Sequence, residues 1–296
     1  MENITEFCTG CRTCEQVCPK SCISMKFSSE GFLEPFIDLG QCVDCGLCQR
    51  RCPQNNLKVY PLSEKVFAVK SKNDKELYKS ASGGAFAALA RYFLEQNGVC
   101  VGASYYKGWN VGHKIIRSLD DLPSLQSSKY VQSDTGNIYI RVKELLENGK
   151  KVLFTGTPCQ VAALKSFLGK DYSGLFTIDL VCHGVPSYDC FKRFLNEISS
   201  EYNKKITNVR LRYKSPYWDY CSVRIDFEDG TDYRKYTVDD PYFTLFNIGY
   251  SLRGSCHTCK YTSCYREGDI TLADFWGYQP SGFKMRNYNK GISCCR

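Results

Sequence analysis

Histidine is scarce in this sequence: only three of its 296 residues are histidines. No Ser-His-Asp set and no catalytic pair of carboxylates can be recognised, so the sequence does not indicate a hydrolase. His183 directly follows Cys182 and is a candidate proton donor, but a loop histidine that hydrogen-bonds to its surroundings is the favoured interpretation. No catalytic residue is therefore assigned from the sequence.

Long apolar runs are also missing. No stretch approaches the ~18 apolar residues of a membrane-spanning helix, so no membrane span is expected. The first ten residues, MENITEFCTG, are polar and include Cys8, which does not fit a signal peptide. We therefore expect a cytoplasmic protein, in which thiols remain reduced. Disulfides then become a weak explanation for many cysteines, and metal binding a strong one.

The positive charge is not concentrated in one tract. The formal net charge is +8, but Lys and Arg are spread along the chain, which is typical of an ordinary solvated surface. A basic face for an acidic redox partner or for cofactor phosphates is the alternative. No nucleic-acid-binding motif is present, so no nucleic-acid partner is expected. With 43% hydrophobic and 24% charged residues, the chain has the composition of a folded protein.

Cysteine, in contrast, is abundant: there are 19, and nine of them lie in the first 52 residues. They include two runs, CTGCRTCEQVCP from Cys8 and CVDCGLCQRRCP from Cys42, both with the spacing C-x2-C-x2-C-x3-C-P. Bacterial ferredoxins have this spacing, and in them the fourth cysteine of each run ligates the 4Fe–4S cluster of the other run. The sequence therefore predicts two clusters. The predicted ligands are Cys8, Cys11, Cys14 and Cys52 for one cluster and Cys42, Cys45, Cys48 and Cys18 for the other.

Structural zinc is the alternative for such cysteine pairs, but a zinc site does not need two complete runs that each end in Cys-Pro. A glycine in each run is expected to relieve crowding beside the cluster. Cys22 fits neither cluster and is interpreted as a small packed residue. The segment between the runs predicts two short strands around a turn at Glu30-Gly31. Residues 1–60 are thus predicted to form a dicluster 4Fe–4S ferredoxin-like domain.

Residues 61–296 alternate between strand-like and helix-like patterns, which predicts an α/β domain with a largely parallel central sheet. The expected strands span 65–70, 98–105, 111–118, 151–156 and 175–182. The expected helices span 80–98, 135–149, 161–169 and 186–199, the first of them capped by Ser80 or Ser82. Residues 206–213, 222–230 and 231–238 are expected to be antiparallel, with a turn at Asp229-Gly230. The expected fold class is therefore α/β, with a mixed sheet and an antiparallel β section.

A loop of small residues and several isolated cysteines are the candidate functional features of this domain. The segment SASGGAF precedes a helix, and its backbone amides could approach a phosphate, although a tight helix start is the alternative. Cys159 and Cys182 are expected beyond the carboxyl ends of two strands, where α/β sheets bind ligands. With the tail segment SCHTCKYTSC they could close a third four-thiolate site. Structural zinc is the competing interpretation, with the ligands Cys256, Cys259, Cys264 and His257.

The motifs ASGGAF, SSKYVQSD, KVLFTGTPCQVAALKSFL, LVCHGVPS, CHTCK and DITLADFWG, in this order, resemble the beta-subunit family of coenzyme F-420 hydrogenases and dehydrogenases. The resemblance covers nearly the whole chain, including the N-terminal ferredoxin module that many bacterial members carry. It implies a flavin-binding α/β domain with FAD and a third 4Fe–4S cluster. The cluster ligands that it implies are Cys159, Cys182, Cys256 and Cys259. The flavin environment that it implies includes Ser82, Gly83, Gly84 and Lys129.

The resemblance also implies a function, that of an iron–sulfur flavoprotein oxidoreductase. Such a protein would move electrons between a small-molecule hydride donor or acceptor, a flavin and the 4Fe–4S clusters. Its expected protein partner is a redox partner protein or a reduced ferredoxin. A non-catalytic electron-transfer adaptor of the ferredoxin type is the alternative function.

Two features depart from the family pattern. Family members usually continue well beyond DFWG, whereas this sequence ends at KGISCCR, which shows no helix or strand pattern, so a truncated C-terminus is one interpretation. Cys264 is an extra thiol beside the third site that the resemblance implies. Cys294 and Cys295 are assigned no role.

Overall fold

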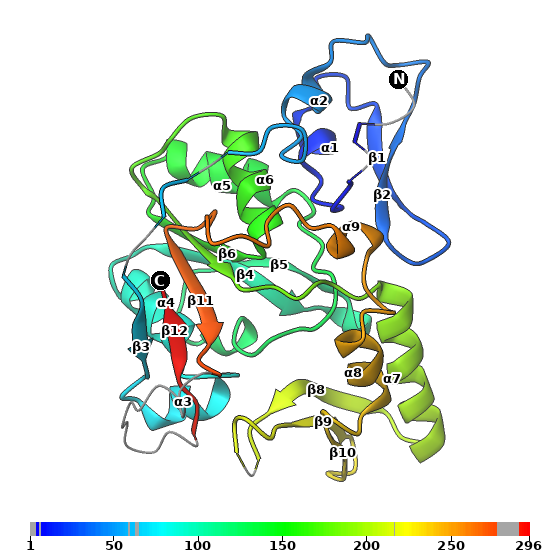
Figure 1. Ribbon diagram of the computed structural model, residues 1–296, viewed down its shortest axis with the longest axis vertical. Helices are drawn as coiled ribbons and strands as arrows, with labels where there is room; N and C mark the ends of the chain where they lie inside the picture. The colour runs from blue at the N-terminus through cyan, green and yellow to red at the C-terminus, as the bar shows by residue number, and fades with distance from the viewer. Residues whose placement is uncertain (1–3, 6, 59, 63–64, 216, 277–289) are drawn as a thin grey trace.

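The computed structural model describes residues 4–5, 7–58, 60–62, 65–215, 217–276 and 290–296 (Figure 1). In this part of the chain the fold is mixed α/β and contains sheets of two, seven and three strands. The expected α/β class, with a mixed sheet and an antiparallel section, is confirmed. Gly277, the last residue of the DFWG motif, lies outside the described residues.

Residues 4–5 and 7–58 form the ferredoxin-like module. Its two antiparallel strands, β1 (Ile23–Phe27) and β2 (Leu33–Ile37), are joined by the predicted turn, in which Gly31 has a φ of 77° that suits glycine. Two short helices, α1 (Thr13–Val17) and α2 (Leu47–Arg50), each begin after a left-handed residue that follows the second cysteine of a run. The two runs therefore fold alike, as their identical spacing suggests.

A seven-stranded sheet forms the centre of the molecule. Its strands are β3 (Phe67–Val69), β4 (Val99–Tyr105), β5 (Val111–Ile116), β6 (Val152–Gly156), β7 (Leu175–Leu180), β11 (Ile270–Asp274) and β12 (Ser293–Cys295). They lie in the order β3-β12-β11-β7-β6-β4-β5. The neighbours β11, β7, β6 and β4 are parallel, whereas β3, β12 and β5 pair antiparallel. The prediction of a largely parallel sheet thus holds for the central strands only.

Strand β12 corrects the expectation that KGISCCR lacks strand structure. Residues 293–295 pair with β11 on one side and with β3 on the other, both antiparallel. A three-residue segment has neither the length nor the alternation that predicts a strand from sequence. Its conformation follows instead from the two neighbouring strands, whose free backbone groups it satisfies.

Side chains alternate between the two faces of this sheet, and helices cover both faces. Val101 of β4 packs with α5 (Ile138–Glu147) and α6 (Pro158–Leu168), which lie above the strands in Figure 1. Its neighbour Cys100 points the other way and packs with α4 (Ala85–Glu95). The result is a sheet buried between two helical layers, the arrangement expected of parallel strands joined by helices.

The start of α4 differs from the expectation. Gly84 is its N-cap residue with a φ of 81°, and no side chain caps the helix. The Ser80 hydroxyl donates instead to the Glu76 carbonyl oxygen, and the Ser82 hydroxyl donates to the Ile292 carbonyl oxygen. The predicted capping by Ser80 or Ser82 is therefore wrong, because the helix begins only at Ala85, after Gly84.

Helix α6 begins at Pro158 rather than at residue 161. Thr157 and Gln160 form a reciprocal capping box, in which each side chain satisfies the backbone amide of the other residue. Cys159 is consequently a residue of the first helical turn and not part of a turn before the helix.

The three-stranded sheet is antiparallel, has the order β10-β9-β8, and turns at Gly230 as predicted. Two helices pack on one face of it and form a second core with many aromatic side chains. The elements of this part are α7 (Tyr188–Tyr202), β8 (Ile206–Tyr213), β9 (Ser222–Phe227), β10 (Asp232–Tyr236) and α8 (Pro241–Asn247). The remaining helices are α3 (Asp74–Lys79), α9 (Gly254–His257) and the 3-10 turns Lys107–Trp109 and Leu122–Ser124.

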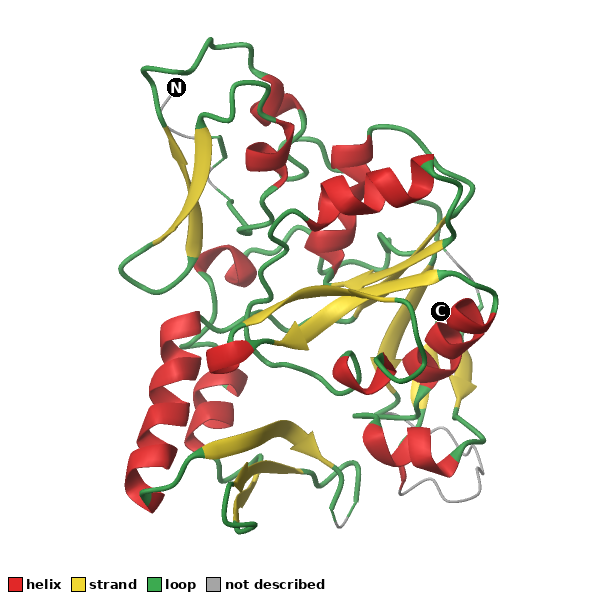
Figure 2. Ribbon diagram, turned by 180° about the vertical axis from the view of Figure 1, so that it is seen from behind, coloured by secondary structure: helices red, strands yellow, loops and turns green. Residues whose placement is uncertain are grey.

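The ferredoxin-like module packs beside α6 (Figure 2). The Thr13 hydroxyl donates to the Ala163 carbonyl oxygen at 3.3 Å, and the Ser166 hydroxyl donates to the Arg51 carbonyl oxygen at 2.7 Å. Thr13 is buried, so its hydroxyl needs this acceptor. Both cysteine-bearing helices of the module are thus tied to the same helix of the central layer.

Gly83 provides a test of how β12 packs. A Cβ at this position would lie 2.4 Å from the Ser293 nitrogen and 2.6 Å from the Val69 oxygen. We expect Gly83→Ala to lower the free energy of unfolding by about 1–3 kcal/mol, as overpacking does. Thermal unfolding of anaerobically purified protein measures the change. Gly254→Ala is the control, since no described atom lies within 4 Å of that Cβ, and equal stability of the two variants would contradict this packing.

Candidate iron–sulfur sites

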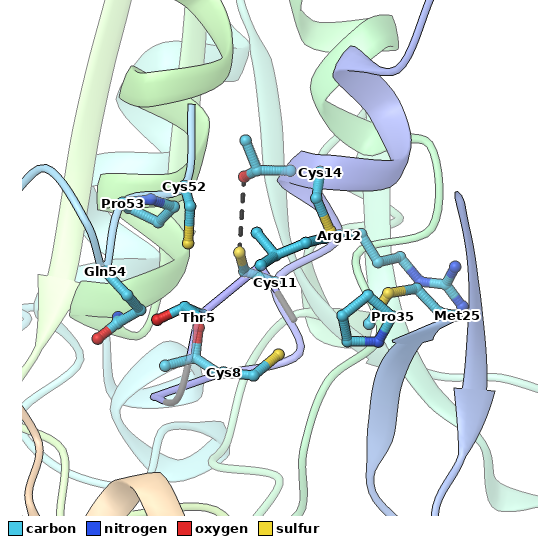
Figure 3. A pocket seen from close by; sticks show the side chains of 13 residues that line it. Thr5, Cys8, Cys11, Arg12, Cys14, Met25, Pro35, Cys52, Pro53 and Gln54 are labelled. Carbon is cyan, nitrogen blue, oxygen red and sulfur yellow. Dashed lines mark hydrogen bonds between the residues drawn. The ribbon is translucent and has the colours of Figure 1, made fainter. Parts of the chain in front are cut away.

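Four cysteines line one cavity of the ferredoxin-like module, which we call the first cavity: Cys8, Cys11, Cys14 and Cys52 (Figure 3). Three of them belong to the first run, and Cys52 is the last cysteine of the second run. Their sulfur atoms surround a common space in the close-up view. The other lining residues are Ile4, Thr5, Thr9, Arg12, Thr13, Met25, Pro35, Pro53 and Gln54. The fold therefore brings together the four thiols that the ferredoxin spacing groups.

The second cavity of the module is lined by Cys18, Cys42, Cys45 and Cys48. Here the first run contributes the single cysteine and the second run contributes three. Cys22 also lines this cavity and is buried, with its sulfur 3.4 Å from that of Cys18. Cys22 is thus a packed residue, as interpreted from the sequence, but it packs directly against a predicted ligand.

Gly10, the glycine of the first run, has a φ of 66° and a crowded environment. A Cβ there would lie 2.5 Å from a Gln132 side-chain nitrogen, 2.8 Å from an Arg253 guanidinium nitrogen and 2.9 Å from the Leu33 oxygen. The crowding therefore comes from the rest of the protein. The Gly10 amide itself points at the Cys8 sulfur at 3.4 Å.

Burial makes weak acids of three thiols of the first cavity, those of Cys8, Cys14 and Cys52. It raises the pKa of Cys14 far above its usual range, and the neighbouring thiols of Cys11 and Cys8 raise it further. Burial also raises the pKa of Cys52 to about 11. Such thiols stay protonated at neutral pH unless a metal replaces the proton. Four sulfur ligands around one apolar cavity are the donor set that a 4Fe–4S cluster requires.

A third group of cysteines comes from three separate segments: Cys159, Cys182, Cys256 and Cys259. Cys159 lies in the first turn of α6, Cys182 follows the end of β7, and Cys256 lies in α9. The loop after Cys182 runs beside α9, because the Arg253 amide donates to the Val185 carbonyl oxygen at 3.0 Å. The strand ends thus direct two distant cysteines toward the C-terminal C-x2-C pair.

Burial and neighbouring thiols raise the pKa values of two cysteines of this group. Burial raises the pKa of Cys182 to about 12, and the thiols of Cys256 and Cys259 contribute to the increase. Burial likewise raises the pKa of Cys159, and the thiols of Cys182, Cys256 and Cys11 raise it further. The segment that carries Cys256 also contacts the first cavity, because the Ser255 hydroxyl donates to the carbonyl oxygen of Cys8, a residue that lines that cavity, at 2.9 Å.

The zinc alternative for the tail predicts a different cluster, of Cys256, Cys259, Cys264 and His257. Cys264 and His257 are both exposed. Across the described ranges, no three His, Cys, Asp or Glu side chains come together as the ligands of a single metal ion do. The cysteines of the first cavity and of the second cavity instead line larger spaces, which suits a cluster better than one ion.

Two of the implied flavin residues make their hydrogen bonds within the chain. The Ser82 hydroxyl donates to the Ile292 carbonyl oxygen at 2.8 Å, and the Gly83 amide donates to the Ser293 hydroxyl at 3.0 Å. Gly84 is the N-cap residue of α4, which no side chain caps. The start of α4 is therefore the part of this loop that fits an anionic group.

Lys129 is a half-buried residue whose ammonium is held by backbone carbonyl groups. Its ammonium donates to the carbonyl oxygens of Ser124, Gln126 and Ser127 at 2.7–3.1 Å. Burial lowers its pKa to about 7. The Gln126 side chain also donates to the Ser80 hydroxyl at 3.4 Å, which connects the Lys129 loop with the loop before α4.

Two further cations lie near this loop that the sequence does not single out, Arg212 and Lys214 of the β8 end. Lys214 donates to the Ser82 carbonyl oxygen at 2.9 Å, and burial lowers its pKa to about 7. Arg212 pairs with Asp274, but its Nη2 atom is buried and has no hydrogen-bond partner among the described residues. The alternation in VRLRYK predicts a strand, and nothing in it marks which cations are buried.

His183 has a structural environment. Its Nε2 atom lies 3.2 Å from the Phe246 carbonyl oxygen, and its ring packs edge-on against the Phe246 ring. This agrees with the interpretation of His183 as a hydrogen-bonded loop histidine.

Comparison with known families connects these sites to a protein class. Residues 149–293 match the family model for the C-terminal part of the beta subunit of coenzyme F420 hydrogenase/dehydrogenase, and residues 7–56 match the 4Fe-4S dicluster domain. Residues 149–293 belong to this beta-subunit family. The dicluster match covers both cysteine runs, so the ferredoxin-like module is a site for two 4Fe–4S clusters.

Relatives and one solved structure support the assignment. A subunit of the F(420)H(2) dehydrogenase of Methanosarcina mazei is 23% identical over 293 residues, which cover 92% of this chain and 78% of that protein. The Coenzyme F420-dependent sulfite reductase of Methanocaldococcus jannaschii is 25% identical over 182 residues, which cover 60% of this chain but 28% of that protein. A chain of the F420-reducing nickel–iron hydrogenase complex from Methanosarcina barkeri shares the fold, with a TM-score of 0.51, 18% identity, and coverage of 81% of this chain and 77% of that one. None of the described helices is long and apolar enough to cross a membrane.

Paired cysteine variants test how the two runs share their ligands. If Cys8 and Cys52 ligate one cluster, Cys8→Ala, Cys52→Ala and the double variant should each lose about four iron atoms. Combining Cys52→Ala with Cys45→Ala should instead remove about eight, because two clusters are then lost. Iron analysis after anaerobic reconstitution measures this. Cys100→Ala, which changes a buried cysteine outside both cavities, is the control. Additive losses for Cys8 and Cys52 would contradict the shared site.

Proposed function

We propose that the chain is an iron–sulfur oxidoreductase subunit that moves electrons between a small-molecule hydride donor or acceptor and a redox partner protein. The observation that carries the proposal is the arrangement of its cysteines in three neighbouring groups. Clusters of the 4Fe–4S type accept and donate single electrons when bound. A row of such sites suits a protein that joins a two-electron reaction to a one-electron partner.

The first and second cavities share one small core. Helix α1 carries Cys14 of the first cavity and ends next to Cys18 of the second, and helix α2 carries Cys48 and is followed by Cys52. Buried and half-buried side chains from both cavities pack in the same hydrophobic cluster. The module therefore keeps its two sites adjacent through two short helices.

The third cysteine group continues this row into the body of the protein. Tyr139 and Tyr261 are buried; burial raises the pKa of each, and the thiols of Cys159 in the third group and of Cys11 in the first cavity raise both further. Cys45 of the second cavity, at the other end of the row, is exposed. The second cavity is thus the port we propose for a redox partner protein or reduced ferredoxin, and the third group is the inner end.

Iron content distinguishes two from three clusters. We expect about twelve iron atoms per chain after anaerobic purification, as three 4Fe–4S clusters require. Cys159→Ala should lose about four of them, because it removes a ligand of the third cluster only. Cys264→Ala, at an exposed thiol of the same segment, should retain them all. About eight iron atoms in the unaltered protein would remove the third cluster from this proposal.

The residues at the start of α4 support a flavin only in part. Half-buried Lys129 and Lys214, together with the buried, unpartnered nitrogen of Arg212, place positive groups near this uncapped helix start, which suits a group with phosphates. The Ser82 hydroxyl and the Gly83 amide, however, are engaged by residues 292–293. We therefore propose that FAD is held by the helix start and by these cations. When bound, FAD would exchange two electrons with a hydride donor and one with a cluster.

Flavin release separates this function from a non-catalytic adaptor. Heat denaturation should release about one FAD per chain, detected by its absorbance, if the proposal is right. Lys129→Met should lower the FAD content while Lys143→Met, at an exposed lysine, should leave it unchanged. Thermal unfolding of both variants shows whether either one fails to fold. Repeated absence of FAD after reconstitution would favour the adaptor, in which Ser82 and Gly83 only secure the C-terminal strand.

The names of the relatives suggest the first hydride donor to examine. Both the dehydrogenase and the sulfite reductase are named for coenzyme F420. We propose reduced coenzyme F420 as one candidate donor for this chain. Bleaching of the clusters by NADH and not by reduced coenzyme F420 would assign the donor to another class.

A further inference from the structure

Arg253 is a buried cation placed between two of the cysteine sites. The residue is 3% exposed, and within the described ranges its guanidinium donates to neutral acceptors only. These are the Gln132 side-chain oxygen at 2.9 Å, the Leu33 carbonyl oxygen at 2.8 Å and the Cys8 carbonyl oxygen at 3.3 Å. Its guanidinium also lies 4.7 Å from the centre of the Phe32 ring.

No carboxylate in the described part of the chain forms an ion pair with this guanidinium. Arg212, the comparable buried arginine, is paired with Asp274. The charged or chargeable groups that act on Arg253 are Glu34, which is exposed, and the thiols of Cys8, Cys256 and Cys159. A buried cation that lacks an opposite charge is unfavourable. Besides exposed Glu34, the groups that can supply negative charge to it are therefore cysteine ligands.

The contacts of Arg253 belong to two sites at once. It donates to the backbone of Cys8, which lines the first cavity. Its own carbonyl oxygen accepts from the amide of Cys256, which belongs to the third cysteine group, at 2.8 Å. Ser255, between them, also donates to the Cys8 carbonyl oxygen at 2.9 Å. One short segment thus spans the two sites, with its positive charge on the inside.

We propose that Arg253 is a positioning residue whose buried charge is shared by the first cavity and the third cysteine group and favours the reduced state of clusters on both sides. A 4Fe–4S cluster held by four thiolates gains one negative charge on reduction, and net charge and hydrogen bonding set its potential. A fixed cation nearby stabilises the added electron, since the interaction is stronger away from water. The inference rests on the proposed function for the third group, but not for the first cavity.

The test compares two substitutions of Arg253 by their reduction potentials. Arg253→Gln removes the charge and keeps a hydrogen-bond donor, whereas Arg253→Lys keeps the charge and loses the forked geometry. Arg253→Gln should make reduction of the first and third clusters about tenfold less favourable, which corresponds to about 59 mV for one electron. Arg253→Lys should restore most of the loss. Anaerobic redox titration followed by electron paramagnetic resonance measures each potential.

Two internal controls make the outcome specific. The second cluster, whose ligands do not contact Arg253, should keep its potential in both variants. Arg234→Gln, on β10 of the antiparallel sheet, should change none of the potentials. An unchanged first cluster in iron-loaded Arg253→Gln protein, or equal shifts of all clusters, would overturn the inference. The inference would also be overturned if Arg253→Lys protein that is fully loaded with iron made reduction of the first cluster tenfold or more less favourable.

A simplified background separates this inference from the proposed third cluster. The double variant Cys45→Ala, Cys159→Ala should contain the first cluster alone. In this double variant, the effect of Arg253→Lys or Arg253→Gln on the reduction potential is measured from the electron paramagnetic resonance signal of one cluster, without overlap from the others. If this single cluster shifts although the unaltered protein contains only two clusters, the charge effect stands and the third cluster falls. If the third cluster is present but the potential of the single cluster does not change, the third cluster stands and the charge effect of Arg253 falls.

Discussion

The arrangement of the cysteine sites depends on hydrogen bonds from the body of the protein to the backbone of the first cysteine run. Gln132 donates to the Thr9 carbonyl oxygen, Thr135 donates to the Cys11 carbonyl oxygen, and Arg253 donates to the Cys8 carbonyl oxygen. These carbonyl groups belong to a loop that has no sheet or helix partners of its own. Buried backbone groups need hydrogen-bond partners, so the same hydrogen bonds determine both the conformation of the loop and its position against the body of the protein. The body of the protein therefore fixes the loop that carries Cys8 and Cys11 of the first cavity.

The parallel strands supply the second half of the arrangement. Strands β6 and β7 are neighbours and run in the same direction, so the segments that follow them leave the sheet at one edge. Cys159 and Cys182 lie in those two segments, and α9 brings Cys256 next to the loop after Cys182. The capping box at Thr157 holds Cys159 in the first turn of α6. A sheet edge, a capped helix and a short C-terminal helix thus converge where the ferredoxin-like module docks.

Features that depend on local spacing can be predicted from the sequence, and features that depend on distant partners cannot. The two cavities follow from the cysteine runs, because each run sets its own turn and helix within a few residues. The central strands follow from apolar periodicity. The role of Ser82 is hidden from the sequence because its acceptor, Ile292, is 210 residues away in the chain. Strand β12 is hidden because three residues take their conformation from the strands on either side.

Arg253 shows the same limit for a functional residue. In the segment LRGSCHTC it reads as an ordinary surface cation beside a cysteine pair, and charged residues are seldom fully buried. Its burial arises only when Gln132, Leu33 and Cys8, from two other parts of the chain, close around it. A segment that contributes both a buried positive charge and two cysteines couples the docking of the ferredoxin-like module to the electrostatics of the sites on either side. Mutations in this segment should therefore be judged by their effect on charge as well as on packing.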